Sequence, residues 1–332
     1  MSSRKRVLLV SVKFMSLYQD IINELERQGY EVSFMEDVCF ERNYYNLRCK
    51  GNKYLHVFQG LFNKFYWRNK IKKNKIDYKF DYFICIDGFS LINSGFIEFL
   101  MNNNPSIKKI LYLYDRTYEN YRFDLLFPLF DNIYSFDIKD CQVYGLNLLP
   151  IYWIPTEVLE KKIDIFGFGT YMENRYQLFL YVDSISNDKK LNSFIKLYIP
   201  EKKQDVFSKI RRIRGGGVPD NIYKSHLITH LTIPPNLFRD YIASSNIVLD
   251  THDIIQDGLT ARFMWALGAG AKIITTNEAA KHYPFYNEEM IKIVDVNNIE
   301  IPPSFFDNSK CYYDNKIVNQ YRIDNWVKTL LS

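Results

Sequence analysis

Three aspartates in the first half of the sequence stand where catalytic carboxylates are often found. Each follows an apolar run typical of a buried strand: Asp87 after Phe80–Ile86, Asp115 after Lys109–Tyr114, and Asp137 after Asn132–Phe136. Ligands of open parallel sheets bind beyond the carboxyl ends of the strands, so we expect these carboxylates at a catalytic edge. A second interpretation stays open for each, because Asp is also favoured at helix N-caps and in turns.

Asp115 is our first choice for a general base, and Asp87 and Asp137 are the other candidates. Asp87 precedes Gly88 in what the sequence predicts as a tight turn, and Asp137 is suited to cap the segment Ile138–Tyr144. A carboxylate at the reaction centre would take the proton of an attacking hydroxyl group.

A second group of residues that could do chemistry lies between Asn246 and Asn277. This stretch predicts a strand, a polar loop, a short helix and another strand. We predict a helix Leu259–Gly268 that opens at Gly258-Leu259-Thr260. Unpaired backbone N–H groups and the positive end of the helix dipole at that point would suit a phosphate group.

Gly258, Arg262 and Trp265 are spaced i, i+4 and i+7, so we expect them on one face of this helix. A bare backbone, a guanidinium group and an indole ring on one face suit a nucleotide diphosphate and its sugar or base. The other interpretation makes Arg262 a surface cation and Trp265 a core residue.

Alternating strands and helices surround both groups of residues. The chain opens with a strand, a helix and a strand at 6–12, 17–28 and 30–34, and a second series of this kind begins at Ile163. We predict an α/β fold with two doubly wound Rossmann-like domains facing a cleft, at 1–155 and 156–314, with a helix at 315–332 that packs back on the first. The loop 13–16 lacks the G-x-G-x-x-G fingerprint, which argues against an NAD-dependent oxidoreductase.

The composition is that of an ordinary globular protein. Its 332 residues are 47% hydrophobic and 24% charged, and the net charge of +5 is too mild for a dedicated nucleic-acid binder. The five cysteines contain no C-x-x-C pair, which predicts neither a disulfide framework nor a zinc ribbon and fits a reducing cytoplasm. No signal peptide and no run of ~20 apolar residues is found, so we expect any membrane contact to be peripheral.

Taken together, the motifs resemble those of a known family, the bacterial capsular and lipopolysaccharide biosynthesis glycosyltransferases of GT-B fold. The characteristic C-terminal pattern of that family is matched by Leu249-Asp250, Gln256, Gly258-Leu259-Thr260, Arg262, Ala266-Leu267-Gly268, Lys272 and Ile274-Thr275-Thr276-Asn277. Further matches are Leu113-Tyr114-Asp115, Phe130-Asp131, Tyr134-Ser135-Phe136-Asp137, and Asp164-Ile165 through Gly169-Thr170 to Arg175. The resemblance extends from Phe80 to Asn277.

This resemblance implies a cytoplasmic enzyme that moves a sugar from a nucleotide-sugar donor to a surface polysaccharide, with a saccharide or lipid-linked saccharide as acceptor. The first domain would serve the acceptor, and the second would bind the donor. The resemblance implies the following donor-binding residues: Gly169, Arg175, Gln256, Gly258, Leu259, Thr260, Arg262 and Trp265. We expect no cofactor and no nucleic-acid partner.

At Trp265 the chain departs from the family, which has a Glu that holds the donor ribose at this position. An indole ring offers a single hydrogen-bond donor and no acceptor, so it cannot hold two hydroxyl groups. Ribose binding must then differ, come from Asp253 or Asp257, or be lost. The alternative function is therefore a catalytically silent homologue that acts as a scaffold or partner in polysaccharide assembly.

The sequence also favours a reaction without a metal ion. No two aspartates are spaced i, i+2, so the Asp-x-Asp motif that holds Mg²⁺ or Mn²⁺ in other glycosyltransferases is absent. We expect Arg175, Arg262 and the helix N-terminus to neutralise the leaving diphosphate instead. His226 and His230 are spaced i, i+4 but lack the Glu of H-E-x-x-H, and we expect no metal site there.

A basic and aromatic run extends from Phe62 to Lys79. It combines Phe65, Tyr66 and Trp67 with Lys64, Arg68, Lys70, Lys72, Lys73 and Lys75. One interpretation is a solvated helix face. The other is docking on the inner face of an anionic membrane, where basic side chains meet lipid charges and aromatic rings enter the headgroup layer.

Overall fold

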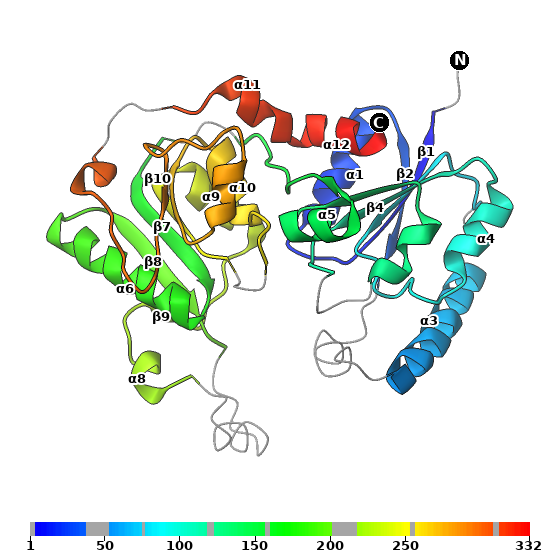
Figure 1. Ribbon diagram of the computed structural model, residues 1–332, viewed down its shortest axis with the longest axis horizontal. Coiled ribbons are helices and arrows are strands. Elements are labelled where there is room, and N and C mark those ends of the chain that lie inside the picture. Colours follow the sequence, from blue (N-terminus) through cyan, green and yellow to red (C-terminus); the bar gives the residue numbers. More distant parts are fainter. Residues whose placement is uncertain are drawn as a thin grey trace. The chain divides into compact units, whose positions relative to one another are not determined.

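The chain forms two compact units in a computed structural model, which describes residues 4–37, 53–74, 77–117, 123–156, 160–200, 218–252, 256–307 and 312–332 (Figure 1). Unit 1 comprises Met1–Tyr152, Ile254–Leu259 and Gln320–Ser332, and unit 2 comprises Trp153–Asp253 and Thr260–Asn319. The chain first passes from unit 1 to unit 2 close to the boundary predicted after residue 155. The return of 256–259 to unit 1 was not predicted.

Unit 1 is built on a parallel sheet of six strands in the order β2-β1-β3-β4-β5-β6. The strands are β1 Arg6–Ser11, β2 Glu31–Glu36, β3 Tyr82–Ile86, β4 Lys108–Leu113, β5 Asn132–Ser135 and β6 Asn147–Leu148. The predicted strand-helix-strand opening is confirmed, with α1 at Leu17–Arg27 between β1 and β2.

Helices cover both faces of this sheet, as a parallel sheet requires. The helices are α1, α3 Lys53–Lys73, α4 Phe96–Asn103, α5 Ile138–Tyr144 and α12 Ile323–Leu331. Alternate residues of β1 serve opposite faces, and Leu8 and Val10 belong to the core that contains Trp67 of α3 and Phe96 of α4. These side chains are fully buried or nearly so, which identifies this core as a main source of stability for unit 1.

The last helix belongs to unit 1. Trp326 of α12 is fully buried, its Nε1 donates a hydrogen bond to the carbonyl of Pro150 at 3.0 Å, and its ring packs against Tyr112 and Tyr152. The single helix predicted over 315–332 is wrong in one respect. The backbone of Arg322 is extended (ψ 143°), which separates the short α11, Asn315–Val318, from α12.

Unit 2 contains a second parallel sheet of six strands, in the order β12-β11-β10-β7-β8-β9. The strands are β7 Ile163–Thr170, β8 Ser193–Tyr198, β9 Ile228–Thr229, β10 Ser245–Asp250, β11 Lys272–Thr275 and β12 Ile291–Ile293. The helices of this unit are α6 Glu173–Asp188, α8 Asp220–Tyr223, α9 Pro235–Ala243, α10 Ala261–Gly268 and α11.

The predicted fold class, α/β with two Rossmann-like domains, is confirmed by these two parallel sheets and the helices that connect their strands. Within the described ranges, none of the helices has the length and apolar character needed to cross a membrane.

Candidate functional site

The three predicted catalytic aspartates lie at one edge of the unit 1 sheet. Their strands β3, β4 and β5 are neighbours and run parallel, so Asp87, Asp115 and Asp137 all follow carboxyl ends at the same edge. The environments of the three carboxylates differ, and these differences separate their roles.

Asp87 organises the backbone of the neighbouring strand end. Its Oδ1 accepts hydrogen bonds from the backbone N–H groups of Tyr114 at 2.7 Å and Asp115 at 3.2 Å. Asp87 is 2% exposed and, like the following Gly88, has a positive φ, which confirms the predicted tight turn. Burial, and next the negative charge of Asp115, raise the pKa of Asp87 well above its ordinary value.

Asp137 is a helix cap, as predicted. Its Oδ1 accepts hydrogen bonds from the N–H groups of Lys139 at 2.9 Å and Asp140 at 3.2 Å, at the start of α5. Its Oδ2 accepts from the N–H groups of Asp257 at 2.8 Å and Gly258 at 3.3 Å. A fully buried carboxylate with both oxygens bonded in this way holds the segment 256–259 in place within unit 1.

Asp115 is half-buried, whereas the other two carboxylates are buried. The side-chain amide of Gln256, a predicted donor-binding residue, lies 3.4 Å from its Oδ1. Because its side chain is more exposed than those of Asp87 and Asp137, Asp115 is the best placed of the three carboxylates for contact with a substrate. Its role as a general base stays a prediction.

The helix that follows the segment 256–259 begins later than predicted. Thr260 is the N-cap of α10, and its Oγ1 accepts a hydrogen bond from the N–H of Phe263 at 3.1 Å. Gly258 is therefore outside the helix, and the prediction that it shares a helix face with Arg262 and Trp265 is wrong. Its N–H is directed at Asp137, so it is not an open phosphate-binding group in this structure.

The structure gives Gly258 a different reason to be glycine. A Cβ at this position would overlap the ring of Phe136, closer than real Cβ contacts come.

The preceding Asp257, named above as a substitute ribose ligand, pairs with Lys139 at 2.8 Å. Asp253 lies outside the described residues. Leu259, the other predicted donor-binding residue of this segment, is fully buried.

Two arginines of unit 2 meet over the backbone of Gly169, near the carboxyl end of β7. A Cβ placed on Gly169 would lie 2.7 Å from Nη1 of Arg175 and 3.1 Å from Nη2 of Arg262. A side chain at this position would displace both guanidinium groups. Three of the predicted donor-binding residues, distant in sequence, are thus brought together.

Arg175 is fixed by the ends of two strands. Its Nε donates a hydrogen bond to Oγ1 of Thr251 at 2.5 Å, Nη1 donates to the carbonyl of Thr170 at 2.6 Å, and Nη2 to the carbonyl of Thr251 at 3.3 Å. These contacts orient the guanidinium group of Arg175 at the carboxyl edge of the sheet.

Arg262 is held less tightly. Its Nη1 lies 3.5 Å from both the carbonyl of Leu249 and Oδ1 of Asp250, at the long end of hydrogen-bond distances. Its Nε is buried and has no hydrogen-bond partner. Burial lowers the pKa of Arg262, and the Asp250 carboxylate opposes this effect. A buried cationic group with an unused donor is suited to receive an anionic oxygen.

Trp265 lies in the core of unit 2 and is 5% exposed. Its ring packs edge-on against Phe238, and the guanidinium of Arg239 lies 4.6 Å from its centroid. The core interpretation of Trp265 is therefore the one that fits. The surface interpretation of Arg262 does not fit, because its side chain is 12% exposed.

Asp250, His252, Thr275 and Thr276 were not among the predicted site residues, although all but His252 belong to the motif matches. Asp250 accepts hydrogen bonds from the hydroxyl groups of Thr260 at 2.6 Å and Thr275 at 3.0 Å. Nδ1 of His252 lies 2.9 Å from the hydroxyl oxygen of Thr276. The available signal was the polar run that follows β10, since polar residues just beyond a parallel strand face the ligand edge.

The described ranges lack a metal-binding cluster. They contain no group of three or more His, Cys, Asp or Glu side chains placed to hold a metal ion. His226 contacts the carboxylate of Asp183 at 2.8 Å, and His230 contacts the carbonyl of Ile199 at 2.8 Å. Metal independence of the reaction stays a prediction.

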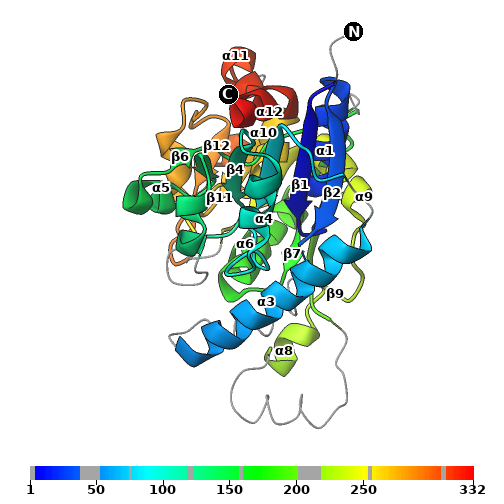
Figure 2. The same cartoon turned by 90° about the vertical axis from the view of Figure 1, so that its right-hand side faces the viewer.

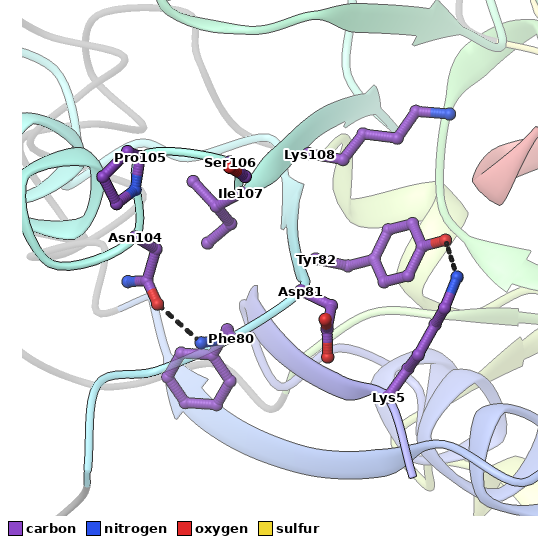
Figure 3. A pocket seen from close by; sticks show the side chains of 9 residues that line it. All are labelled: Lys5, Phe80, Asp81, Tyr82, Asn104, Pro105, Ser106, Ile107 and Lys108. Carbon is purple, nitrogen blue, oxygen red and sulfur yellow. Dashed lines mark hydrogen bonds between the residues drawn. The ribbon is translucent and has the colours of Figure 1, made fainter. Parts of the chain in front are cut away.

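A hollow of about 380 Å³ opens at the other edge of the unit 1 sheet, where β3 and β4 begin (Figure 3). Its lining residues are Lys5, Phe80, Asp81, Tyr82, Asn104, Pro105, Ser106, Ile107 and Lys108. Lys5 contacts the Tyr82 hydroxyl at 3.4 Å, and Asn104 accepts from the N–H of Phe80 at 2.7 Å (Figure 3). Because it lies at the amino ends of the strands, we do not assign it to the candidate site.

Comparison with known proteins gives weak likenesses only. No protein-family model and no curated protein matches the chain. Among solved structures, the glycotransferase of kitacinnamycin has a TM-score of 0.46 at 9% identity, covering 99% of this chain and 98% of that one. TcCGT1 in complex with UDP has a TM-score of 0.46 at 8% identity, covering 99% and 94%. D-lactate dehydrogenase from Escherichia coli reaches 0.21 at 10% identity, covering 81% and 74%. Scores at this level assign neither a family nor an activity.

Proposed function

We propose that this protein is a glycosyltransferase whose second unit binds a nucleoside-diphosphate sugar. The observation that carries the proposal is the meeting of the Arg175 and Arg262 guanidinium groups over the bare backbone of Gly169. Two guanidinium groups that converge on one point offer several N–H donors to an anion with several oxygens. The carboxyl edge of a Rossmann-like sheet is where nucleotides bind.

A diphosphate suits these two arginines better than a single carboxylate would. Arg175 is oriented in advance by Thr170 and Thr251, so one of its faces is fixed before a ligand arrives. Arg262 supplies the second charge, with its buried Nε unpaired. Guanidinium groups bind phosphate oxygens in pairs of parallel hydrogen bonds, which two converging arginines can offer to two phosphates.

The same arrangement fits the chemistry of sugar transfer. A hydroxyl oxygen of the acceptor attacks the anomeric carbon, the bond from that carbon to the diphosphate oxygen breaks, and the diphosphate leaves with its negative charge. Cations that are already in place stabilise this charge as it develops. In an inverting reaction, Asp115 of unit 1 takes the proton of the acceptor hydroxyl.

The acceptor class rests on the resemblance of the motifs described above. That resemblance supports a capsule or lipopolysaccharide saccharide, free or lipid-linked, as acceptor, and a cytoplasmic reaction. The absence of Asp-x-Asp from the sequence, together with the arginine pair, supports charge neutralisation without a metal ion.

One observation favours the alternative of a catalytically silent homologue. Trp265 stands where the family it resembles has a ribose-binding Glu, and its side chain is buried against α9. A silent protein would bind the donor weakly or not at all, and would transfer no sugar. Measured donor affinity and donor turnover therefore distinguish the two functions.

The test is calorimetric titration of wild type and three variants with UDP, GDP and dTDP. Arg262→Ala removes a charge-assisted contact worth about 1.5–3 kcal/mol, so affinity for the preferred nucleotide should weaken roughly ten- to a hundredfold. Arg262→Lys keeps the charge but not the paired geometry, and should lie in between. Lys281→Ala, an exposed cation of the same unit, should have no effect. Equal affinities of Arg262→Ala and wild type for every nucleotide would place the site elsewhere.

A further inference from the structure

The long helix α3 of unit 1 (Figure 2) has buried residues on one side and exposed residues on the other. On the inner side, Nδ2 of Asn63 donates a hydrogen bond to the carbonyl of Ile92 at 2.9 Å. Nε1 of Trp67 donates to the carbonyl of Ser90 at 2.9 Å, and its ring stacks on Phe96 with centroids 4.1 Å apart. These contacts fix which side of α3 faces outward.

Large apolar side chains occupy the outward side. Leu61 and Phe65 are 62% and 65% exposed, and Phe62 is 43% exposed. Leu61, Phe65, Arg68 and Lys72 follow one another at spacings of four, three and four residues, which places them in one stripe along the helix, opposite Trp67. Single exposed apolar residues are ordinary, but several on consecutive turns indicate a binding surface.

The charges of α3 all have one sign. The helix contains six Lys or Arg residues and no Asp or Glu among its 21 residues. Three of these cations, Arg68, Lys72 and Lys73, are exposed and follow Phe65 along the helix. Exposure to water alone does not account for the exposed phenylalanines. An uncharged apolar partner does not account for the exposed cations. A partner with negative charges at its surface and an apolar interior below would bind both the exposed cations and the exposed apolar side chains of α3.

We propose that α3 docks unit 1 on an anionic lipid bilayer through a docking face made of Leu61, Phe62, Phe65, Arg68, Lys72 and Lys73. The helix would lie in the plane of the headgroups, with the two phenylalanines and the leucine inserted and the cations among the lipid phosphates. The proposal does not depend on sugar transfer. If both hold, docking brings the enzyme to the surface that carries a lipid-linked acceptor.

The structure corrects the sequence-based form of this hypothesis. Trp67 is fully buried, so it cannot enter a headgroup layer. The ammonium group of Lys70 bonds to the carbonyl of Glu36 and the hydroxyl of Tyr66, so these two side chains turn toward unit 1. Leu61, which precedes the run 62–79, joins the face. Lys75 lies outside the described residues.

The experiment is co-sedimentation of the full chain with vesicles of phosphatidylcholine alone or mixed equally with phosphatidylglycerol. Wild type should bind the mixed vesicles at least tenfold more tightly than the neutral ones, and less tightly as salt rises. Each cation at such a surface contributes a factor of about five, equivalent to ~1 kcal/mol, so Arg68→Gln/Lys72→Gln/Lys73→Gln should lose about a hundredfold. Leu61→Ser/Phe65→Ser should lose tenfold or more, because the inserted apolar area is removed.

Matched controls come from exposed positions of unit 2. Lys162→Gln/Lys281→Gln/Lys316→Gln removes the same charge, and Leu231→Ser/Leu237→Ser removes comparable exposed apolar groups; both should bind like wild type. Unchanged circular dichroism and nucleotide affinity would show that the α3 variants are folded and that the donor site is a separate matter. Equal loss in the control variants, or no preference of wild type for anionic vesicles, would overturn the proposal. So would a wild-type dimer in gel filtration that Leu61→Ser/Phe65→Ser converts to a monomer, since the face would then bind a second copy.

Discussion

Gly169→Ala is the sharpest perturbation of the arginine pair, because it adds one methyl group between two guanidinium groups. The new Cβ would lie 2.7 Å from Nη1 of Arg175 and 3.1 Å from Nη2 of Arg262. Ordinary contacts need about 3.4 Å or more, so both groups must withdraw by several tenths of an ångström. The 2.6 Å hydrogen bond from Arg175 to Thr170 would be strained or lost.

We expect Gly169→Ala to weaken nucleotide binding more than it lowers the free energy of unfolding. Arg262 is held only by long contacts, and Arg175 keeps its two hydrogen bonds to Thr251, so we expect the unfolding free energy to fall by no more than about 1.5 kcal/mol. Losing one charge-assisted contact to the diphosphate removes about 1.5–3 kcal/mol, which weakens nucleotide affinity roughly ten- to a hundredfold. Calorimetric titration with UDP, GDP and dTDP, together with urea unfolding, measures both quantities.

Gly167→Ala, two residues earlier in β7, is the matched control. Its Cβ would lie 3.0 Å from Cδ1 of Leu249 and 3.1 Å from the ring of Phe179, which are core atoms that cannot withdraw into solvent. We expect overpacking to cost about 1–3 kcal/mol of stability, with nucleotide affinity unchanged. If Gly169→Ala binds every nucleotide like wild type, or if Gly167→Ala weakens binding equally, the assignment of the arginine pair is refuted.

Three further predictions concern the carboxylates and the metal. Asp115→Asn should lower turnover by about 10²- to 10⁴-fold with nucleotide affinity intact, and a loss below tenfold in a steady-state transfer assay would exclude a general base. The folded-state pKa of Asp87 is raised, so the folded protein retains this proton longer, and stability falls as pH rises from about 4 through that pKa. In urea unfolding across that window, wild type should therefore lose up to about 1.4 kcal/mol per pH unit relative to Asp87→Asn, and parallel curves would contradict the buried acid. Transfer should persist in EDTA, whereas activity lost in EDTA and restored by Mn²⁺ would show a metal-dependent reaction.

Much of the fold could be predicted because a buried strand can be recognised from its own short run of apolar residues. Residues 7–10 of β1 are all fully buried, and their apolar, β-branched character alone indicates a strand covered on both faces. The aspartates at the ends of β3, β4 and β5 follow from the same rule, since parallel neighbours end at one edge. The capping role of Asp137 was also predictable, because a cap and the helix it starts are adjacent in sequence.

The start of α10 could not be predicted in this way. Gly258 and Leu259 have the local character of a helix opening, but the N–H groups of Asp257 and Gly258 bond to Asp137, more than 100 residues away. A local pattern does not contain a distant hydrogen-bond partner. The helix instead begins where Thr260 supplies its own cap.

The different surroundings of the Arg262 and Trp265 side chains could not be predicted from the sequence either. Their spacing predicts one shared face, yet Arg262 contacts Asp250 while Trp265 packs against Phe238 of α9. Long side chains on one helix can diverge according to what lies beneath them. The contact of both guanidinium groups with Gly169 became visible only when the ends of β7 and β10 were brought together.

Hydrogen exchange with and without nucleotide tests the central claim most directly, because it locates the site without assuming any variant. We predict that at least one of UDP, GDP and dTDP slows amide exchange in 168–176 and 260–263, and that CMP, which has a single phosphate, does so less. Protection by these nucleotides confined to other segments, or no protection by any of them at millimolar concentration, would contradict a diphosphate site at the arginine pair.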